Sequence, residues 1–212
     1  MGIVTLNRIQ VNVRNRRNPY IDKQKNSRYN KRKTEVLPMN EAYTNLLERR
    51  SIRKYSDRPV SDELLDAVLK AGIYAPSGMN TQGVRLVAVR DPETVAYLSK
   101  LNAAVMNADR DPFYGAPCVI VVLADPEIYG GWVEDGALAL GNMMNAAHAL
   151  GLGSCWIHRA KQVFDAPEGK SLLEKWGLPT HFRGVGNCIL GYPDCEHPNP
   201  APRKEGRIVK IG

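Results

Sequence analysis

The feature that most constrains the fold is a short stretch in the middle of the chain that is apolar on both of its faces. Residues 119–123 read Val-Ile-Val-Val-Leu, inside an apolar run that covers residues 117–124. Alternate side chains of a strand point to opposite faces, so a strand without polar residues must be covered on both sides. The run is much shorter than the roughly 18 apolar residues that a membrane-spanning helix needs. It therefore predicts a central strand with helices on both sides of its sheet.

The chain around this strand alternates between helical and extended patterns, with no internal repeat. Helices are predicted over residues 40–50, 61–72, 91–101 and 132–150, and the principal strands over residues 84–90, 119–123 and 185–190. Tyr43, Leu46 and Leu47 share one face of the first helix, and Ile208, Val209 and Ile211 could form a further short strand. We expect one layered α/β-type domain over residues 39–212.

The first 38 residues differ in charge and composition from the rest. The chain carries a net charge of +7, but residues 1–38 hold ten of the 29 basic and two of the 22 acidic side chains, which leaves the remainder close to neutral. This segment predicts a basic, flexible arm, in which Ile9, Val11 and Val13 could form one short strand. It could bind nucleic acid or an anionic membrane, or act as a targeting peptide. It could equally be an extension ahead of a true start at Met39. The neutral domain makes nucleic acid an unlikely partner for the chain as a whole.

Several common functional motifs are absent from the sequence. Gly151 and Gly153 begin like a dinucleotide fingerprint, but Trp156 stands where the third glycine belongs. No phosphate-binding GxxxxGK[ST] loop, HExxH or paired CxxC occurs, so no metal site is expected. The four cysteines form no CxxC pair and predict free thiols. With no secretory signal pattern and no apolar run long enough for a membrane, we expect a cytoplasmic protein without a membrane partner.

A dense cluster of cations follows the first predicted helix. The segment Arg49-Arg50-Ser51-Ile52-Arg53-Lys54 holds four cations and a hydroxyl group. In an extended stretch, Arg49, Ser51 and Arg53 would point the same way and could bind the two negative charges of a phosphate monoester. The alternative is that the basic side chains complement the carboxyl end of the helix.

Four motifs in register resemble the FMN-dependent nitroreductase family over about residues 40–210. They are residues 47–55 (LERRSIRKY), 75–82 (APSGMNTQ), 147–157 (AHALGLGSCWI) and 191–193 (GYP). The resemblance implies an α+β fold, a three-layer α-β-α sandwich with a central mixed, mostly antiparallel sheet. It also implies a homodimer with FMN at the subunit interface, where both chains contribute to each site.

The resemblance assigns cofactor-binding roles residue by residue. The phosphate and the pyrimidine edge of the flavin would be held by Arg49, Arg50, Ser51 and Arg53. The loop along the ring and the ribityl chain would include Pro76, Ser77, Asn80 and Gln82. The flavin face would be covered by Cys155, Trp156 and Ile157. Arg203 and Lys204 resemble a basic pair that returns to the phosphate. Trp156 could instead be an ordinary core aromatic. Arg203 and Lys204 could instead be solvated charges of the tail.

The resemblance also implies the chemistry. NADH or NADPH and then a small acceptor, such as a nitroaromatic or a quinone, would use one pocket in a ping-pong two-electron cycle, with no catalytic side chain required. Alternatives are dehalogenation, flavin modification, another dehydrogenation, or a flavin-containing binding or regulatory protein whose arm contacts nucleic acid. Gly83 and Val84 replace a frequent proline and aromatic residue of the family, which predicts a roomier pocket. Phe113 and Tyr114 could line it or pack in the core.

Overall fold

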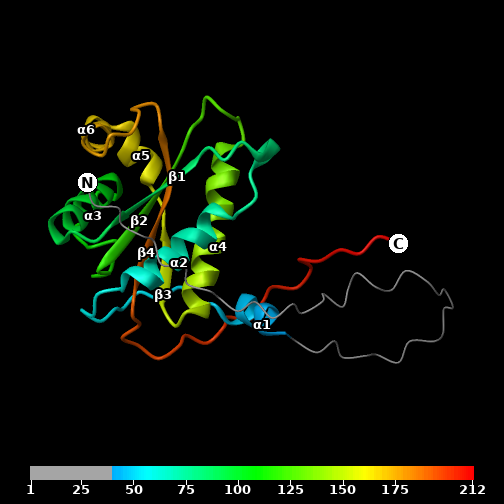
Figure 1. Cartoon of the computed structure of the whole chain (residues 1–212). Helices are drawn as coiled ribbons and strands as arrows, with labels where there is room; N and C mark the ends of the chain where they lie inside the picture. Colours follow the sequence, from blue (N-terminus) through cyan, green and yellow to red (C-terminus); the bar gives the residue numbers. More distant parts are fainter. Residues whose placement is uncertain (1–39) are drawn as a thin grey trace, which may run out of the picture. The chain divides into compact units, whose positions relative to one another are not determined.

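The computed structural model describes residues 40–212 (Figure 1). The predicted basic arm over residues 1–38, with its short strand at Ile9, Val11 and Val13, lies outside the described residues. None of the helices in residues 40–212 has both the length and the apolar character needed to cross a membrane.

A four-stranded sheet forms the centre of the described domain. Its strands are β1 (Val84–Val89), β2 (Cys118–Ala124), β3 (Gly153–Ile157) and β4 (Arg183–Gly191), in the order β1-β2-β4-β3. Every residue of β2 is buried, which confirms the predicted central strand. Each neighbouring pair is antiparallel. The predicted mostly antiparallel sheet is confirmed, but these four strands contain no parallel pair, and a parallel contact appears as an isolated bridge between Ser51 and Ser154.

Helices cover both faces of this sheet (Figure 1). They are α1 (Glu41–Glu48), α2 (Asp62–Ile73), α3 (Pro92–Met106), α4 (Trp132–Ala149), α5 (Ala160–Asp165) and α6 (Pro167–Lys175), with a 3₁₀ turn η1 (Gly78–Asn80). Val119 and Val121 of β2 pack in one apolar cluster with residues of α3, α5 and α6. Ile120 and Val122 pack in a second cluster with α2 and α4. The three-layer α-β-α arrangement is thus present.

The helix starts agree with the residues that predicted them. The side chain of Asn40 accepts a hydrogen bond from the Tyr43 amide at 2.8 Å, and Ser61 accepts one from the Leu64 amide at 3.4 Å. The Asp91 carboxylate accepts one from the Thr94 amide at 2.9 Å ahead of α3. Side-chain capping of this kind satisfies amides that have no partner within the helix.

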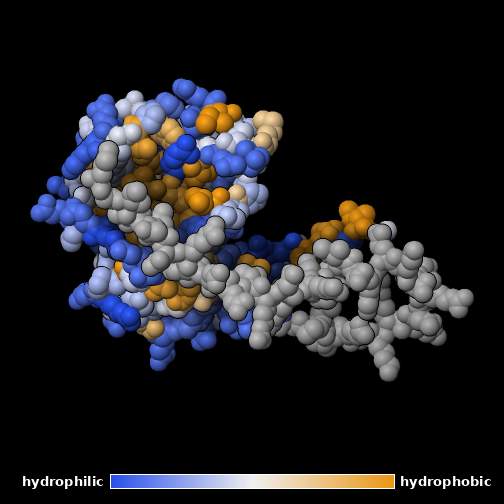
Figure 2. All heavy atoms as spheres, viewed as in Figure 1, coloured by the Kyte–Doolittle hydropathy of each residue, from blue (hydrophilic) through white to orange (hydrophobic). Residues whose placement is uncertain are grey.

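Three elements were not predicted, and one predicted strand is wrong. β3, α5 and α6 were not predicted because β3 is only five residues long and neither α5 nor α6 has a side-chain cap. Ile208, Val209 and Ile211 form no strand, and they are exposed in the tail, where Figure 2 shows apolar residues near its end. Their alternation had no sheet edge to pair with. No residue of α1 is buried within the described part of the chain, so its predicted apolar face remains exposed there.

Candidate active site

The basic segment after α1 lies beside the edge strand β3. The Ile52 amide donates a hydrogen bond to the Ser154 carbonyl oxygen at 3.0 Å, next to the Ser51–Ser154 bridge. A Cβ atom on Gly153 would stand 2.9 Å from the Cβ of Ile52, so glycine is needed for this close approach. The first part of the segment is therefore fixed by the glycine that begins β3.

The far end of the segment is held by the residues that follow β4. The Ser56 amide donates to the Tyr192 carbonyl oxygen at 3.0 Å, and Tyr55 bridges to Pro193. The Tyr55 hydroxyl donates to the Ile52 carbonyl oxygen at 2.6 Å. Burial raises the pKa of Tyr55 well above its usual value, so this hydroxyl stays protonated. Three of the four sequence motifs thus meet around one edge of the sheet.

Arg49 and Arg50 carry buried nitrogen atoms that lack partners. The Arg50 Nη1 atom donates to the carbonyl oxygens of Leu47 and Arg49 at 2.7 and 2.8 Å, which fits the alternative of a helix carboxyl end. The Nε atom of Arg50 and the Nη1 atom of Arg49 are buried without a hydrogen-bond partner among residues 40–212. A buried unsatisfied donor costs about 1–3 kcal/mol, and more when it is charged. An anion within reach of either donor would supply the acceptor that it lacks.

A small pocket joins Arg53 to the residues of β3. It has a volume of about 200 Å³ and is lined by Arg53, Met106, Arg110, Pro112, Tyr114, Cys155, Trp156, Ile157, His158 and Arg159. Ligand pockets usually measure about 300–1,000 Å³, so the described chain forms only part of one here. The pocket brings the predicted Arg53 together with the predicted Cys155, Trp156 and Ile157.

Within this group, the side chains of β3 themselves are largely occupied by packing. The Trp156 indole lies over Gly186, where a Cβ atom would stand 2.5 Å from its Nε1 atom. Cys155 and Ile157 belong to the buried cluster on the opposite face of the sheet. Trp156 is half-buried: it packs against the cluster that contains α4 and also borders the pocket.

The cysteines of the described chain are free, as predicted, and burial keeps two of them protonated. Cys118, Cys155 and Cys188 are buried, and Cys195 is exposed. Burial raises the pKa of Cys118 to about 11 and that of Cys188 well above its usual range. A thiol must ionise before it can act as a nucleophile, so the thiols of Cys118 and Cys188 are inert.

The predicted loop over residues 76–82 forms a second group. Its turn η1 is tied to α4 because the Gly78 amide donates to the Asp135 carboxylate at 2.9 Å. The Gln82 amide donates to Ser77 Oγ, and the Gln82 side chain donates to Asn80 Oδ1, both at 3.1 Å. Met79, Asn80 and Gln82 have positive φ angles of 49°, 57° and 52°. Backbone strain in residues other than glycine concentrates at functional sites, which makes this loop a candidate for one.

The two groups lie toward opposite ends of α4 (Figure 1). The loop is bonded to Asp135 in the first turn of α4, whereas Asn45 of α1 donates to the carbonyl oxygen of Asn145 in its last part at 3.0 Å. Ten residues of α-helix separate these anchors, a distance of about 15 Å. Within one chain, the arginine cluster and the loop are therefore anchored at different ends of α4.

The predicted basic pair in the tail stays apart as well. Arg203 and Lys204 are exposed and form no ion pair within residues 40–212. The start of the tail, however, lies near the arginine cluster, because the His197 ring is 5.4 Å from the ring of His148 on α4. Arg203 follows His197 by six residues.

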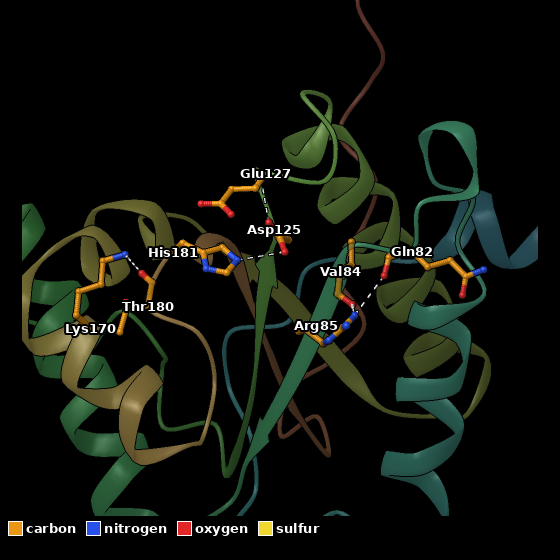
Figure 3. Close-up of polar contacts among 8 residues, drawn as sticks. All are labelled: Gln82, Val84, Arg85, Asp125, Glu127, Lys170, Thr180 and His181. Carbon is orange, nitrogen blue, oxygen red and sulfur yellow. Dashed lines mark hydrogen bonds and ion pairs between the residues drawn. The ribbon is translucent and has the colours of Figure 1, made fainter.

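Other polar features lie near the loop. Figure 3 shows His181, whose Nε2 atom is 3.2 Å from an oxygen of Asp125, with Glu127 nearby. Burial acts to raise the pKa of Asp125, but the hydrogen bonds from Glu127 and His181 outweigh it and keep that pKa low. The Gln82 side chain points away from this pair.

Sequence reasoning missed the contribution of Arg110 and Arg159 to the small pocket. Neither lies in a motif, and each reaches the pocket through the folded connections around α3 and β3. Tyr114 also lines the pocket, as one alternative predicted, whereas Phe113 is buried in the core. A larger cavity of about 930 Å³ lies beside α3, and Phe113 is among the residues that line it.

Comparisons with known proteins show which family the sequence and the fold resemble. The Nitroreductase family model matches residues 46–113 and 105–192. A relative from Archaeoglobus fulgidus, provisionally named an NADH dehydrogenase/NAD(P)H nitroreductase, is 38% identical over 163 residues, which cover 74% of this chain and 88% of the relative. An FMN reductase [NAD(P)H] of Bacillus subtilis is 30% identical over 171 residues, covering 73% and 67%. The crystal structure of a Bacteroides fragilis nitroreductase with bound FMN superimposes with a TM-score of 0.75 at 29% identity, covering 82% of this chain and all of the other.

The fold and these relatives define an oxidoreductase of the NAD(P)H nitroreductase and FMN reductase type. The chain belongs to the nitroreductase family, as the four motifs predicted.

Proposed function

We propose that this protein is an FMN-dependent oxidoreductase that uses NADH or NADPH for the two-electron reduction of a small acceptor such as a nitroaromatic or a quinone. The observation that carries the proposal is the pair of buried, unpaired guanidinium nitrogens of Arg49 and Arg50. Ser51 follows them in the sequence, and a phosphate would supply the acceptor oxygens that these donors lack.

In this proposal the other predicted residues hold the rest of the cofactor. Arg53, at the small pocket, would face the pyrimidine edge and stabilise negative charge there. Ser77, Asn80 and Gln82 would offer short polar groups to the ribityl hydroxyls and ring carbonyls. The residues of β3 would cover one face of the ring. FMN supplies the hydride chemistry when bound, so the proposal requires no nucleophilic side chain.

The divided site supports a homodimer, with FMN at the interface between two copies. The cluster at one end of α4 and the loop at the other can serve one cofactor if each copy contributes one of them. Leu46 and Leu47 of α1 are 59% and 49% exposed, and Leu138 of α4 is 47% exposed. Apolar surface of this kind marks contact with a partner. The tail with Arg203 and Lys204 would reach a phosphate in the same assembly.

The remaining expectations complete the proposal. Residues 39–212 would form the catalytic domain and residues 1–38 an arm whose role is separate from catalysis. The cytoplasm is the compartment that suits the free cysteines. Dehalogenase, flavin-modifying and other dehydrogenase activities remain alternatives for the same site. So does a flavin-containing regulatory protein that binds nucleic acid through the arm.

The test is an assay of the purified full chain with FMN, NADH or NADPH, and an added nitroaromatic or quinone. We expect steady oxidation of the nicotinamide that depends on the acceptor. No acceptor-dependent oxidation, together with salt-sensitive binding of nucleic acid that disappears when residues 1–38 are removed, would favour the regulatory alternative instead.

A further inference from the structure

The small pocket beside β3 contains more positive charge than the proposed cofactor needs. Arg53, Arg110 and Arg159 all line it, and none of its described lining residues is a carboxylate. These three arginines form no ion pair within residues 40–212. If the proposed function holds, Arg49 and Arg50 neutralise the phosphate, and Arg53 faces the pyrimidine edge. The charges of Arg110 and Arg159 are then left for another anion.

Arg159 is held in place by a buried support. Its Nε atom donates to the Asn102 Oδ1 atom at 3.1 Å, and the Asn102 side chain donates to the His158 carbonyl oxygen at 2.8 Å. Asn102 is 0% exposed, although it is a polar residue of α3. A buried amide that is bonded through both its oxygen and its nitrogen fixes the direction of the guanidinium group.

The backbone of Arg159 is also strained. Its φ angle is 76°, in the left-handed region that favours glycine. This conformation costs an ordinary residue about 1–2 kcal/mol and persists where the surroundings demand it. Tyr114, on the other side of the pocket, also has a positive φ of 54°, and its ring centroid is 5.9 Å from the Arg53 guanidinium carbon. Two strained residues therefore border the same small pocket.

From this geometry we propose that Arg110 and Arg159 form an anion subsite that selects a carboxylate on the electron acceptor. The subsite rests on the proposed function, because it lies beside the strand predicted to cover the flavin. A planar carboxylate fits the two-pronged guanidinium of Arg159. The 2′-phosphate of NADPH suits the place less well, because it is at the far end of the dinucleotide from the nicotinamide ring.

The test compares two acceptors of nearly the same shape, para-nitrobenzoate and its neutral counterpart para-nitrobenzamide. In the first reduction, para-nitrobenzoate, NADPH and a proton yield para-nitrosobenzoate, NADP⁺ and water, with two electrons passing to the nitro group. We expect kcat/KM for the carboxylate to exceed that for the amide about 10-fold in the FMN-loaded enzyme, since one charged hydrogen-bonded contact is worth about that factor.

Arg159→Gln should remove this preference mainly through KM for the carboxylate, and Arg159→Lys should restore part of it. Arg110→Gln should act in the same direction. Lys161→Gln is the matched control, because Lys161 is an exposed residue of α5, two residues beyond Arg159 and outside the pocket, and the change also removes one positive charge. Equal rates for the two acceptors in the wild type, or a preference that survives in Arg159→Gln, would overturn the proposal. A changed ratio of NADPH to NADH use with unchanged acceptor preference would also overturn it, in favour of the dinucleotide phosphate.

A binding measurement separates this proposal from the proposed function. Calorimetric titration of the protein with benzoate should show binding that weakens about 10-fold in Arg159→Gln, whereas benzamide should bind equally to both. Benzoate binding without turnover of any acceptor would leave the subsite standing and defeat the proposed activity. No benzoate binding to the wild type, in a protein that does reduce nitroaromatics, would defeat the subsite alone.

Discussion

At the scale of residues, the most informative atoms are the two buried nitrogens of Arg49 and Arg50 that lack partners. The sequence offers two explanations for the dense positive charge after the first helix, namely binding of an anion and hydrogen bonding to the carboxyl end of the helix. The structure shows which guanidinium atoms take part in the second. Arg50 Nη1 completes the helix end, while Arg50 Nε and Arg49 Nη1 have no acceptor among residues 40–212. Lys54 in the same segment points elsewhere and pairs with Asp194 at 2.9 Å.

This difference predicts unequal effects of removing neighbouring charges. Arg49→Gln or Arg50→Gln should weaken FMN binding about 10- to 100-fold, because each removes a charged hydrogen bond worth about 1.5–3 kcal/mol. Lys54→Gln should change it less than about twofold, because its pair with Asp194 is exposed. Fluorescence titration of the FMN-free protein measures all three. Equal losses for Lys54→Gln and Arg49→Gln would mean that general charge attracts FMN.

Gly153 tests whether the basic segment must be held against β3. In Gly153→Ala the new methyl group would lie 2.9 Å from the Cβ and Cγ2 of Ile52, so we expect a loss of about 1–3 kcal/mol in the free energy of unfolding together with weaker FMN binding. Gly130→Ala is the control, because nothing lies within 4 Å of its added Cβ. Denaturant titration measures the stability. An unchanged Gly153→Ala protein would show that the close approach is not needed.

At the scale of elements, the contact between the tail and α4 depends on two histidines. Burial lowers the pKa of His148 below its usual value, and the nearby charges of His197, Arg49 and Arg50 lower it further. The folded protein therefore takes up a proton at His148 less readily than the unfolded chain does. The contribution of His148 to the free energy of unfolding is therefore fully present above the ordinary histidine pKa of about 6.5. It is lost as the pH drops toward the pKa of His148 in the folded protein.

We accordingly expect the Tm to fall between about pH 7.5 and pH 5.5, and to fall less in His148→Gln. Differential scanning calorimetry of both proteins at the two pH values measures the effect. His181→Gln serves as the comparison for a general loss of a histidine, because it is remote from the tail and bonded to Asp125. If His148→Gln keeps the whole pH dependence, another group is responsible.

The elements also show which parts of the molecule a sequence can predict. β2 and the caps at Asn40, Ser61 and Asp91 were predictable, because burial on two faces and capping leave signals within a few residues. β3 was not, since a five-residue edge strand of mixed composition is defined by its pairing with β4. In the candidate site, Arg49 and Ser51 were predictable because they belong to a short segment with four cations. Arg110 and Arg159 meet only through the packing of α3 against α5, which leaves no local pattern.

At the scale of the whole molecule, the proposed dimer accounts for the exposed face of α1 and for the divided site. Leu47→Asp should raise the dimer dissociation constant about 100-fold or more. In a two-fold dimer the substitution removes one leucine from each copy, and burial of each leucine is worth about 1.5–3 kcal/mol. FMN should be lost together with the dimer. Val105→Asp is the control, because Val105 of α3 is an apolar residue of similar exposure (41%) on another element.

Light scattering after size-exclusion chromatography measures the assembly state, and the absorbance of the same peak reports the flavin. A monomeric Leu47→Asp protein that still carries FMN would contradict the proposal that two copies build each site. A monomeric wild type that binds FMN would contradict it more directly.

The central claim is that the guanidinium groups of Arg49 and Arg50 bind the phosphate of FMN, and it is tested most directly by titrating the FMN-free full chain with FMN and with riboflavin, which differs by lacking that phosphate. We predict that FMN binds at least about 100-fold more tightly, because the phosphate satisfies two buried charged donors. Equal affinities for the two flavins, or no binding of FMN at all, would contradict this account.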